Sequence, residues 1–145
     1  MKERYLKSVR LLSECFHGFE QLSANHVRDS GLTPSQFDVL ATLGNTKGMC
    51  FRELGDKTLI TKGTLTGVVD RMEAKGLVRR AALPDDRRMK VVELTGRGEK
   101  EFARLFLPHI AFCKQSFNDY REEDFAALES ALMKLKACLS PGTAG

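Results

Sequence analysis

Residues 60–78 decide the fold, and they read Ile60-Thr-Lys-Gly-Thr-Leu-Thr-Gly-Val-Val-Asp-Arg-Met-Glu-Ala-Lys-Gly-Leu-Val78. Four apolar side chains in this stretch recur at i, i+3, i+4 and i+7, which predicts one buried stripe along a helix. They are Leu65, Val68, Val69 and Met72. Thr61 is a good N-cap for this helix, and Gly76 ends it. We therefore expect one side of the helix to fasten it to its domain.

The opposite side of this helix carries small and short polar residues, among them Thr64 and Thr66. Gly63 and Gly67 also lie there, and each costs about 1 kcal/mol relative to alanine inside a helix. Close approach of the backbone to another surface would explain that cost, and close packing against a neighbouring helix is the alternative. Lys62 in the first turn is placed to reach a phosphate or a guanine edge.

The segments around this helix complete a recognisable order. A short helix is expected at 51–57, before the helix. After it, residues 77–82 and 89–94 have strand character, and Leu83-Pro-Asp-Asp-Arg-Arg88 between them has the composition of a turn. Helix, turn, helix and hairpin predict a helix-turn-helix with a β-hairpin wing, whose second helix enters the major groove of DNA.

The basic excess of the chain lies on the same segment. The chain has 23 Lys and Arg against 19 Asp and Glu, for a net charge of +4, and residues 61–90 alone hold eight basic and four acidic residues. A solvated face is the ordinary explanation of a charge run, but this run coincides with the helix-turn-helix. Arg87 and Arg88 at the wing tip are expected in the minor groove. The candidate DNA-binding residues are Thr61, Lys62, Thr64, Thr66, Arg71, Arg87, Arg88 and Lys90.

Three segments resemble the MarR family, the multiple antibiotic resistance regulators. Phe51-Arg-Glu-Leu-Gly55 together with residues 60–78 is similar to that family's helix-turn-helix. Asp86-x-Arg88, followed by Val91-Val-Glu-Leu-Thr95, is similar to its wing, and Leu32-Thr-Pro-Ser-Gln-Phe-Asp-Val-Leu40 to its second helix. The resemblance implies a mainly α fold with a small β-hairpin wing. It also implies a homodimeric transcriptional regulator, usually a repressor, that binds double-stranded DNA at a palindromic operator.

The flanking helices agree with a dimer. The first helix, which ends near Gly31, and the helices at 95–118 and 122–139 hold more large apolar residues than a small winged domain requires. A dimer interface would absorb them, whereas a monomer would need a larger single core. The expected organisation is dimerisation helices at 1–30 and 95–140, a winged helix-turn-helix at 31–94 and a disordered tail at 141–145.

Two kinds of switch for DNA binding are compatible with the sequence. The resemblance implies a small phenolic or other aromatic effector between the dimerisation helices and the winged region, and the sequence assigns no residues to its site. One branch of the family senses organic peroxides through a cysteine in the first helix, where this chain has Cys15. A redox-sensing repressor acting through Cys15 is therefore kept as an alternative. A winged helix that serves as a protein-interaction module is a second alternative.

Other classes find little support. No apolar run approaches the roughly 20 residues of a membrane-spanning helix, and the start MKERYLKSVR lacks the apolar region of a secretory signal. We therefore expect a cytoplasmic protein without a membrane partner. His17, His26 and His109 are far apart in the sequence and show no ligand spacing, so no metal is expected. The sequence has no phosphate-binding motif and no nucleophile motif, so we expect no cofactor and no enzymatic activity.

Overall fold

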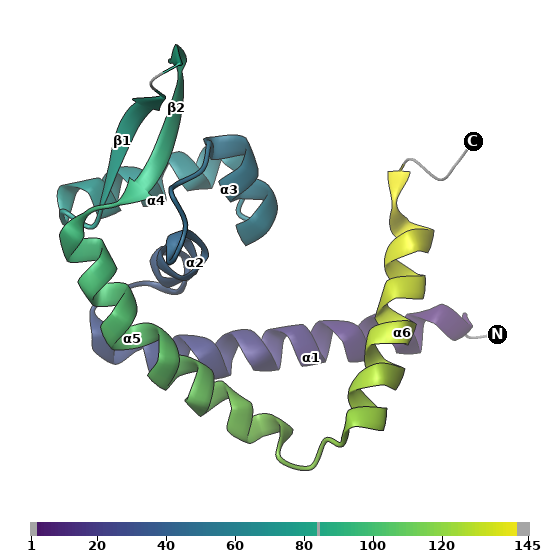
Figure 1. Cartoon of the computed structure of the whole chain (residues 1–145). Helices are drawn as coiled ribbons and strands as arrows, with labels where there is room; N and C mark the ends of the chain where they lie inside the picture. Colours follow the sequence, from purple (N-terminus) through teal and green to yellow (C-terminus); the bar gives the residue numbers. More distant parts are fainter. Residues whose placement is uncertain (1–2, 84, 142–145) are drawn as a thin grey trace. The chain divides into compact units, whose positions relative to one another are not determined.

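The computed structural model describes residues 3–83 and 85–141, which form six α-helices, two short 3-10 helices and one two-stranded hairpin (Figure 1). The elements are α1 (Arg4–Val27), η1 (Arg28–Ser30), α2 (Pro34–Leu43), α3 (Phe51–Thr58), α4 (Lys62–Ala74), β1 (Val78–Leu83), β2 (Asp86–Leu94), α5 (Gly96–Lys114), η2 (Gln115–Phe117) and α6 (Glu122–Leu139). The mainly α fold with a small hairpin is as predicted. The chain divides into two compact units, Met1–Phe112 and Cys113–Gly145.

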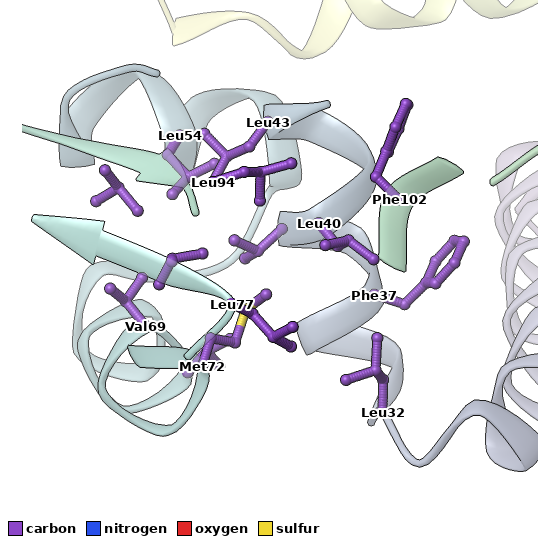
Figure 2. Close-up of a cluster of buried hydrophobic side chains, with 14 of the residues drawn as sticks. Leu32, Phe37, Leu40, Leu43, Leu54, Val69, Met72, Leu77, Leu94 and Phe102 are labelled. Carbon is purple, nitrogen blue, oxygen red and sulfur yellow. The ribbon is translucent and has the colours of Figure 1, made fainter. Parts of the chain in front are cut away.

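The core of the first unit lies between α2, α3, α4 and the hairpin. Figure 2 shows Leu40 of α2, Val69 of α4 and Leu77 converging on it. The apolar stripe predicted for α4 is confirmed, because all four of its side chains are buried. Burial of a leucine-sized side chain stabilises a fold by about 1.5–3 kcal/mol. This stripe therefore fixes which face of α4 remains exposed.

Local side-chain bonds set the ends of several helices. The Thr33 hydroxyl accepts a hydrogen bond from the Gln36 amide (3.2 Å), and the Gln36 side chain accepts one from the Thr33 amide (3.3 Å). This capping box starts α2 at the predicted place. The Thr95 hydroxyl accepts from the Gly98 amide (3.1 Å) at the start of α5, and it donates to the Gly76 carbonyl (2.5 Å). Gly76 itself has a left-handed φ of 74° after α4, as a helix-ending glycine should.

The hairpin is longer than the sequence predicted. Val78 pairs with Leu94 and Ala82 with Lys90, and an irregularity in the register follows Ala82. The predicted turn at 83–88 is wrong in its extent, because β1 continues through Leu83 and β2 begins at Asp86. Backbone pairing of the two strands therefore extends farther than the turn-forming residue types indicated, and Arg88 belongs to a strand.

Within the first unit, close packing of the start of α5 depends on two glycines. A Cβ at Gly98 would collide with the Leu77 carbonyl oxygen, and a Cβ at Gly44 would collide with the Phe102 ring. Phe102 is buried and stacks on Phe106, with 4.7 Å between the ring centroids. The N-terminal half of α5 is thus fixed to the winged region by steric fit.

The second unit contains the predicted last helix at the predicted bounds, as α6. A small aromatic cluster packs the residues before this helix against its first turn. The ring centroids of Phe117 and Tyr120 lie 5.7 and 5.0 Å from that of Phe125. The Asp124 carboxylate accepts a hydrogen bond from the Arg121 amide (2.9 Å) in the first turn. The disordered tail predicted at 141–145 lies, beyond Pro141, outside the described residues.

Candidate nucleic-acid interface

The turn between α3 and α4 holds the two helices through buried and polar contacts. Leu54 and Leu65 are buried in the core. The Thr58 hydroxyl donates to the Leu54 carbonyl (2.7 Å) and accepts from the Ile60 amide (3.4 Å). Leu59 has a left-handed φ of 61° and is 83% exposed. Sequence reasoning missed this strained, exposed leucine, because only the backbone shows the left-handed conformation.

The outward face of α4 carries the predicted polar residues. Thr61, Lys62, Thr64 and Thr66 are all exposed. Thr61 stands at the N-cap position, but the predicted cap bond is wrong, since its hydroxyl donates to the Thr64 hydroxyl (3.1 Å) and accepts no hydrogen bond from a helix amide. The reason is geometric: the two hydroxyls lie three residues apart on one face, within reach of each other. The Thr61 side chain therefore leaves the first amides of α4, those of Lys62 and Gly63, without a cap.

The two glycines of α4 have no packing role within the part of the chain that the structure describes. A Cβ at Gly63 would meet no atom within 4 Å, and one at Gly67 would meet only the Arg71 guanidinium, at 3.7 Å. Close packing against a neighbouring helix of the same chain is therefore ruled out as their explanation. The remaining explanation for the two glycines is close approach of the helix backbone to a surface outside this chain.

One arginine of the basic segment joins the hairpin to the helix-turn-helix. Arg80 on β1 donates to Asp70 (2.6 Å) and Glu73 (2.7 Å) of α4, and its guanidinium lies 5.5 Å from the centroid of the Phe51 ring on α3. The hydrogen bond that Arg80 donates to Asp70 is the main cause that raises the pKa of Arg80. We call these four residues the Arg80 clamp. It ties β1, α3 and α4 together.

The other basic residues divide between structural and exposed roles. Arg79 pairs with Glu93 across the hairpin (2.7 Å), and the Lys75 ammonium donates to the Gly31 carbonyl (3.1 Å) and the Gln36 side chain (3.0 Å). Among the residues that the structure describes, four of the predicted cations are exposed and have no carboxylate partner. They are Lys62, Arg71, Arg88 and Lys90. The side chain of Arg87 lies outside the described part.

A histidine pair lies at the junction of α1, α2 and α5. His26 Nδ1 and His109 Nδ1 are 2.9 Å apart, and His109 Nε2 is 3.1 Å from the Ser23 hydroxyl. These two histidines are 83 residues apart in the sequence, and the fold brings them into contact. Burial, followed by the charge of His26, lowers the pKa of His109. No sequence spacing could have predicted this contact.

A cavity opens beside the histidine pair. It has a volume of about 290 Å³. Its walls come from the end of α1, from α2 through Phe37, and from α5 through Leu105 and Pro108. The Phe37 ring lies 4.5 Å from the His109 ring between centroids. The apolar walls and the His26 imidazole suit a small aromatic molecule that also forms a hydrogen bond.

Comparison with known proteins identifies the family. The sequence profile of the MarR family matches residues 30–89. The HTH-type transcriptional regulator MhqR of Bacillus subtilis is 32% identical over 124 residues, which are 86% of each chain. The chain belongs to the MarR family. Sco3205 of Streptomyces coelicolor, a MarR family transcriptional regulator solved in complex with DNA, matches with a TM-score of 0.83 and 24% identity over 100% of this chain and 94% of its own.

A second solved structure is similar to this MarR-family chain. It concerns the regulation of DNA binding of Bordetella bronchiseptica BpsR by 6-hydroxynicotinic acid. Its TM-score is 0.79, with 25% identity over 94% of this chain and 97% of BpsR. MarR-family proteins are transcriptional regulators, so the prediction of a regulator in place of an enzyme is confirmed. Within residues 3–83 and 85–141, no helix is long and apolar enough to cross a membrane.

Proposed function

We propose that this chain is a homodimeric, sequence-specific DNA-binding repressor of the cytoplasm that a small-molecule effector releases from its operator. The observation that carries the proposal is the outward face of α4, where two glycines without a packing role lie among exposed threonines and cations. A bare backbone lets a helix approach a groove closely, and the cations neutralise phosphates. The DNA complex of Sco3205, which shares the fold, supports this reading.

Each candidate residue has a distinct task on DNA. The solvent-facing first turn of α4, with Thr61 and Lys62, would bind a phosphate. Thr64 and Thr66 would face base edges in the major groove. On the hairpin, Arg88 and Lys90, with Arg87, would contact the minor groove and its phosphates. Arg71, farther along α4, would add a phosphate contact.

An exposed apolar stripe on α1 supports the homodimer. Tyr5, Val9 and Phe16 are 61%, 48% and 60% exposed, and Phe19 is 45% exposed. Such a stripe is unfavourable in water, and a second copy of the same helix is self-complementary to it. The helices of 1–30 and 95–140 would then hold two α4 helices about one duplex turn apart, roughly 34 Å, on a palindromic operator.

The cavity beside His26 and His109 is our proposed effector site. Its volume of about 290 Å³ lies near the lower end of small-molecule sites, which suits a single aromatic ring. A phenolic hydroxyl or a ring carboxylate would form a hydrogen bond with the His26 imidazole, since both nitrogens of His109 are already engaged. The regulation of BpsR by 6-hydroxynicotinic acid supports an aromatic effector of this kind.

DNA binding tests the proposal directly. We would measure the affinity of the protein for the DNA upstream of its own gene, at several salt concentrations, against a random duplex of equal length. The proposal requires preference for the upstream DNA and a steep loss of affinity with salt. Arg88→Ala should weaken binding to both duplexes, whereas Thr64→Ala should reduce the preference between them. Equal affinity for the two duplexes would overturn sequence-specific regulation.

A further inference from the structure

A second cavity, separate from the DNA face, is lined by uncompensated positive charge. It has a volume of about 430 Å³ and lies between the η1–α2 connection, the end of α4 and the first turns of α5. Its charged walls are Lys75, Arg97, Glu101 and Arg104. This volume falls within the range of small-molecule sites, about 300–1,000 Å³, and greatly exceeds the ~30 Å³ that one water occupies.

Lys75 is held in place at this cavity without being neutralised. Its ammonium donates to the Gly31 carbonyl and to the side chain of Gln36, which is 4% exposed. Gln36 is in turn fixed by the capping box of α2. Both acceptors of Lys75 are neutral, and the ammonium has three donors, so one donor and the full charge are available to a third partner.

The other charges of the cavity do not cancel Lys75. Glu101 pairs with Arg104 at 2.6 Å, so that these two side chains compensate each other. Within the described part of the chain, Arg97 has no ion pair, and its Nη1 lies 3.9 Å from where a Cβ of Gly76 would stand. Lys75 and Arg97 therefore leave the cavity with two positive charges, contributed by α4 and by α5.

We propose that this cavity is a binding site for a small organic anion that carries a phosphate or carboxylate group. A guanidinium from α5 and an ammonium from α4 suit such a group, since arginine binds both kinds of oxyanion in a fork and lysine binds them as a point charge. The occupant would bridge the end of α4 to α5 and so fix the winged region on α5. This site is distinct from the proposed aromatic effector cavity, with which it shares only Ser30 and Arg104.

Isothermal titration of the full chain, free of DNA and at low ionic strength, tests the site. The probes are glycerol 3-phosphate, succinate and inorganic phosphate, and the variants are Arg97→Gln and Lys100→Gln. Lys100 is an exposed residue of α5 that does not line the cavity, so its substitution makes the same charge change elsewhere. Arg97 has an exposed side chain, so both variants should fold, and thermal unfolding checks this.

The expected result is saturable binding of at least one organic probe, weakened about tenfold or more by Arg97→Gln and unchanged by Lys100→Gln. Preference for glycerol 3-phosphate or for succinate then assigns the anionic group. Equal weakening by the two variants would show diffuse attraction and overturn the site. Lack of saturable binding by all three probes would also overturn it. Because no DNA is present, these outcomes are independent of the regulator proposal.

Discussion

The Arg80 clamp is expected to align the wing with α4, and Arg80→Met tests it. Methionine keeps an unbranched apolar side chain but removes the guanidinium and its two charge-assisted hydrogen bonds. The Arg80 side chain is 23% exposed, while Asp70 and Glu73 are 59% and 43% exposed. Because the carboxylates are partly solvated, each pair contributes about 0.5–1 kcal/mol, toward the upper part of the range for surface pairs.

The magnitude of the effect follows from these two ion pairs. Their loss gives about 1–2 kcal/mol of destabilisation, which for a chain of 145 residues lowers Tm by about 3–6 °C. When the variant binds DNA, part of the binding free energy is spent on aligning the wing with α4, which the clamp does in the wild type. A cost of about 1–2 kcal/mol corresponds to a Kd that is about five- to thirtyfold weaker.

The matched control for charge is Arg79→Met. Arg79 is the preceding residue on β1, and it forms one ion pair, with Glu93, in which its side chain is 67% exposed. Both variants lose one positive charge from the same strand, so long-range attraction to DNA falls equally. Thermal unfolding and fluorescence anisotropy on the upstream DNA are the two assays. Equal losses for Arg79→Met and Arg80→Met in both assays would refute the alignment role.

Four further predictions concern single residues. Gly55→Ala should stabilise the fold by about 0.5–1 kcal/mol, since a Cβ there would have ordinary contacts with Ile60 (3.5 Å) and Leu65 (3.7 Å); denaturant unfolding measures it. The lowered pKa of His109 means that the unfolded chain binds a proton first, so stability should fall as the pH drops below about 6.5, and His109→Gln should flatten that slope. Burial raises the pKa of Asp38 to about 6. This carboxyl therefore destabilises the folded state increasingly as the pH rises from about 4 to 6. Asp38→Asn should therefore stabilise the fold at pH 7, by about 1 kcal/mol once partial exposure is discounted, and unfolding at pH 4 should show no such gain. Apolar residues lie one helical turn before and after Cys15, so treatment with an organic peroxide should leave the DNA affinity of the wild type unchanged. The Cys15→Ser variant should behave in the same way. A loss of DNA affinity that peroxide causes in the wild type alone would establish the redox alternative.

The sequence predicted those features that depend on local pattern. The buried stripe of α4 follows from spacing, and the start of α2 follows from Thr33 with Pro34, because both signals act within one or two helical turns. The bounds of α6 were predicted from acidic residues at its start and an apolar stripe. In each case the residues that decide the structure are neighbours in the chain.

Features that depend on distant contacts could not be predicted. The His26–His109 pair and the bonds of Lys75 join segments 39 to 83 residues apart, and sequence spacing carries no information about them. The ends of the hairpin were wrong because backbone pairing outweighed turn composition. Arg80 was counted as part of a basic run, since only the fold shows which cations face carboxylates.

The unfavourable features of the first unit lie together, and this argues for a single functional face. Gly63 and Gly67 each cost about 1 kcal/mol without packing within the described chain, and Leu59 adds a left-handed backbone at the turn before them. A domain is stable by only about 5–15 kcal/mol, so a cost of this size at one place is substantial. Four exposed cations without carboxylate partners, Lys62, Arg71, Arg88 and Lys90, lie on this helix and on the adjoining hairpin, whereas Arg80 and Lys75 hold the frame. The bare backbone and the unpaired positive charge of this face both suit one kind of partner, a polyanion with a groove.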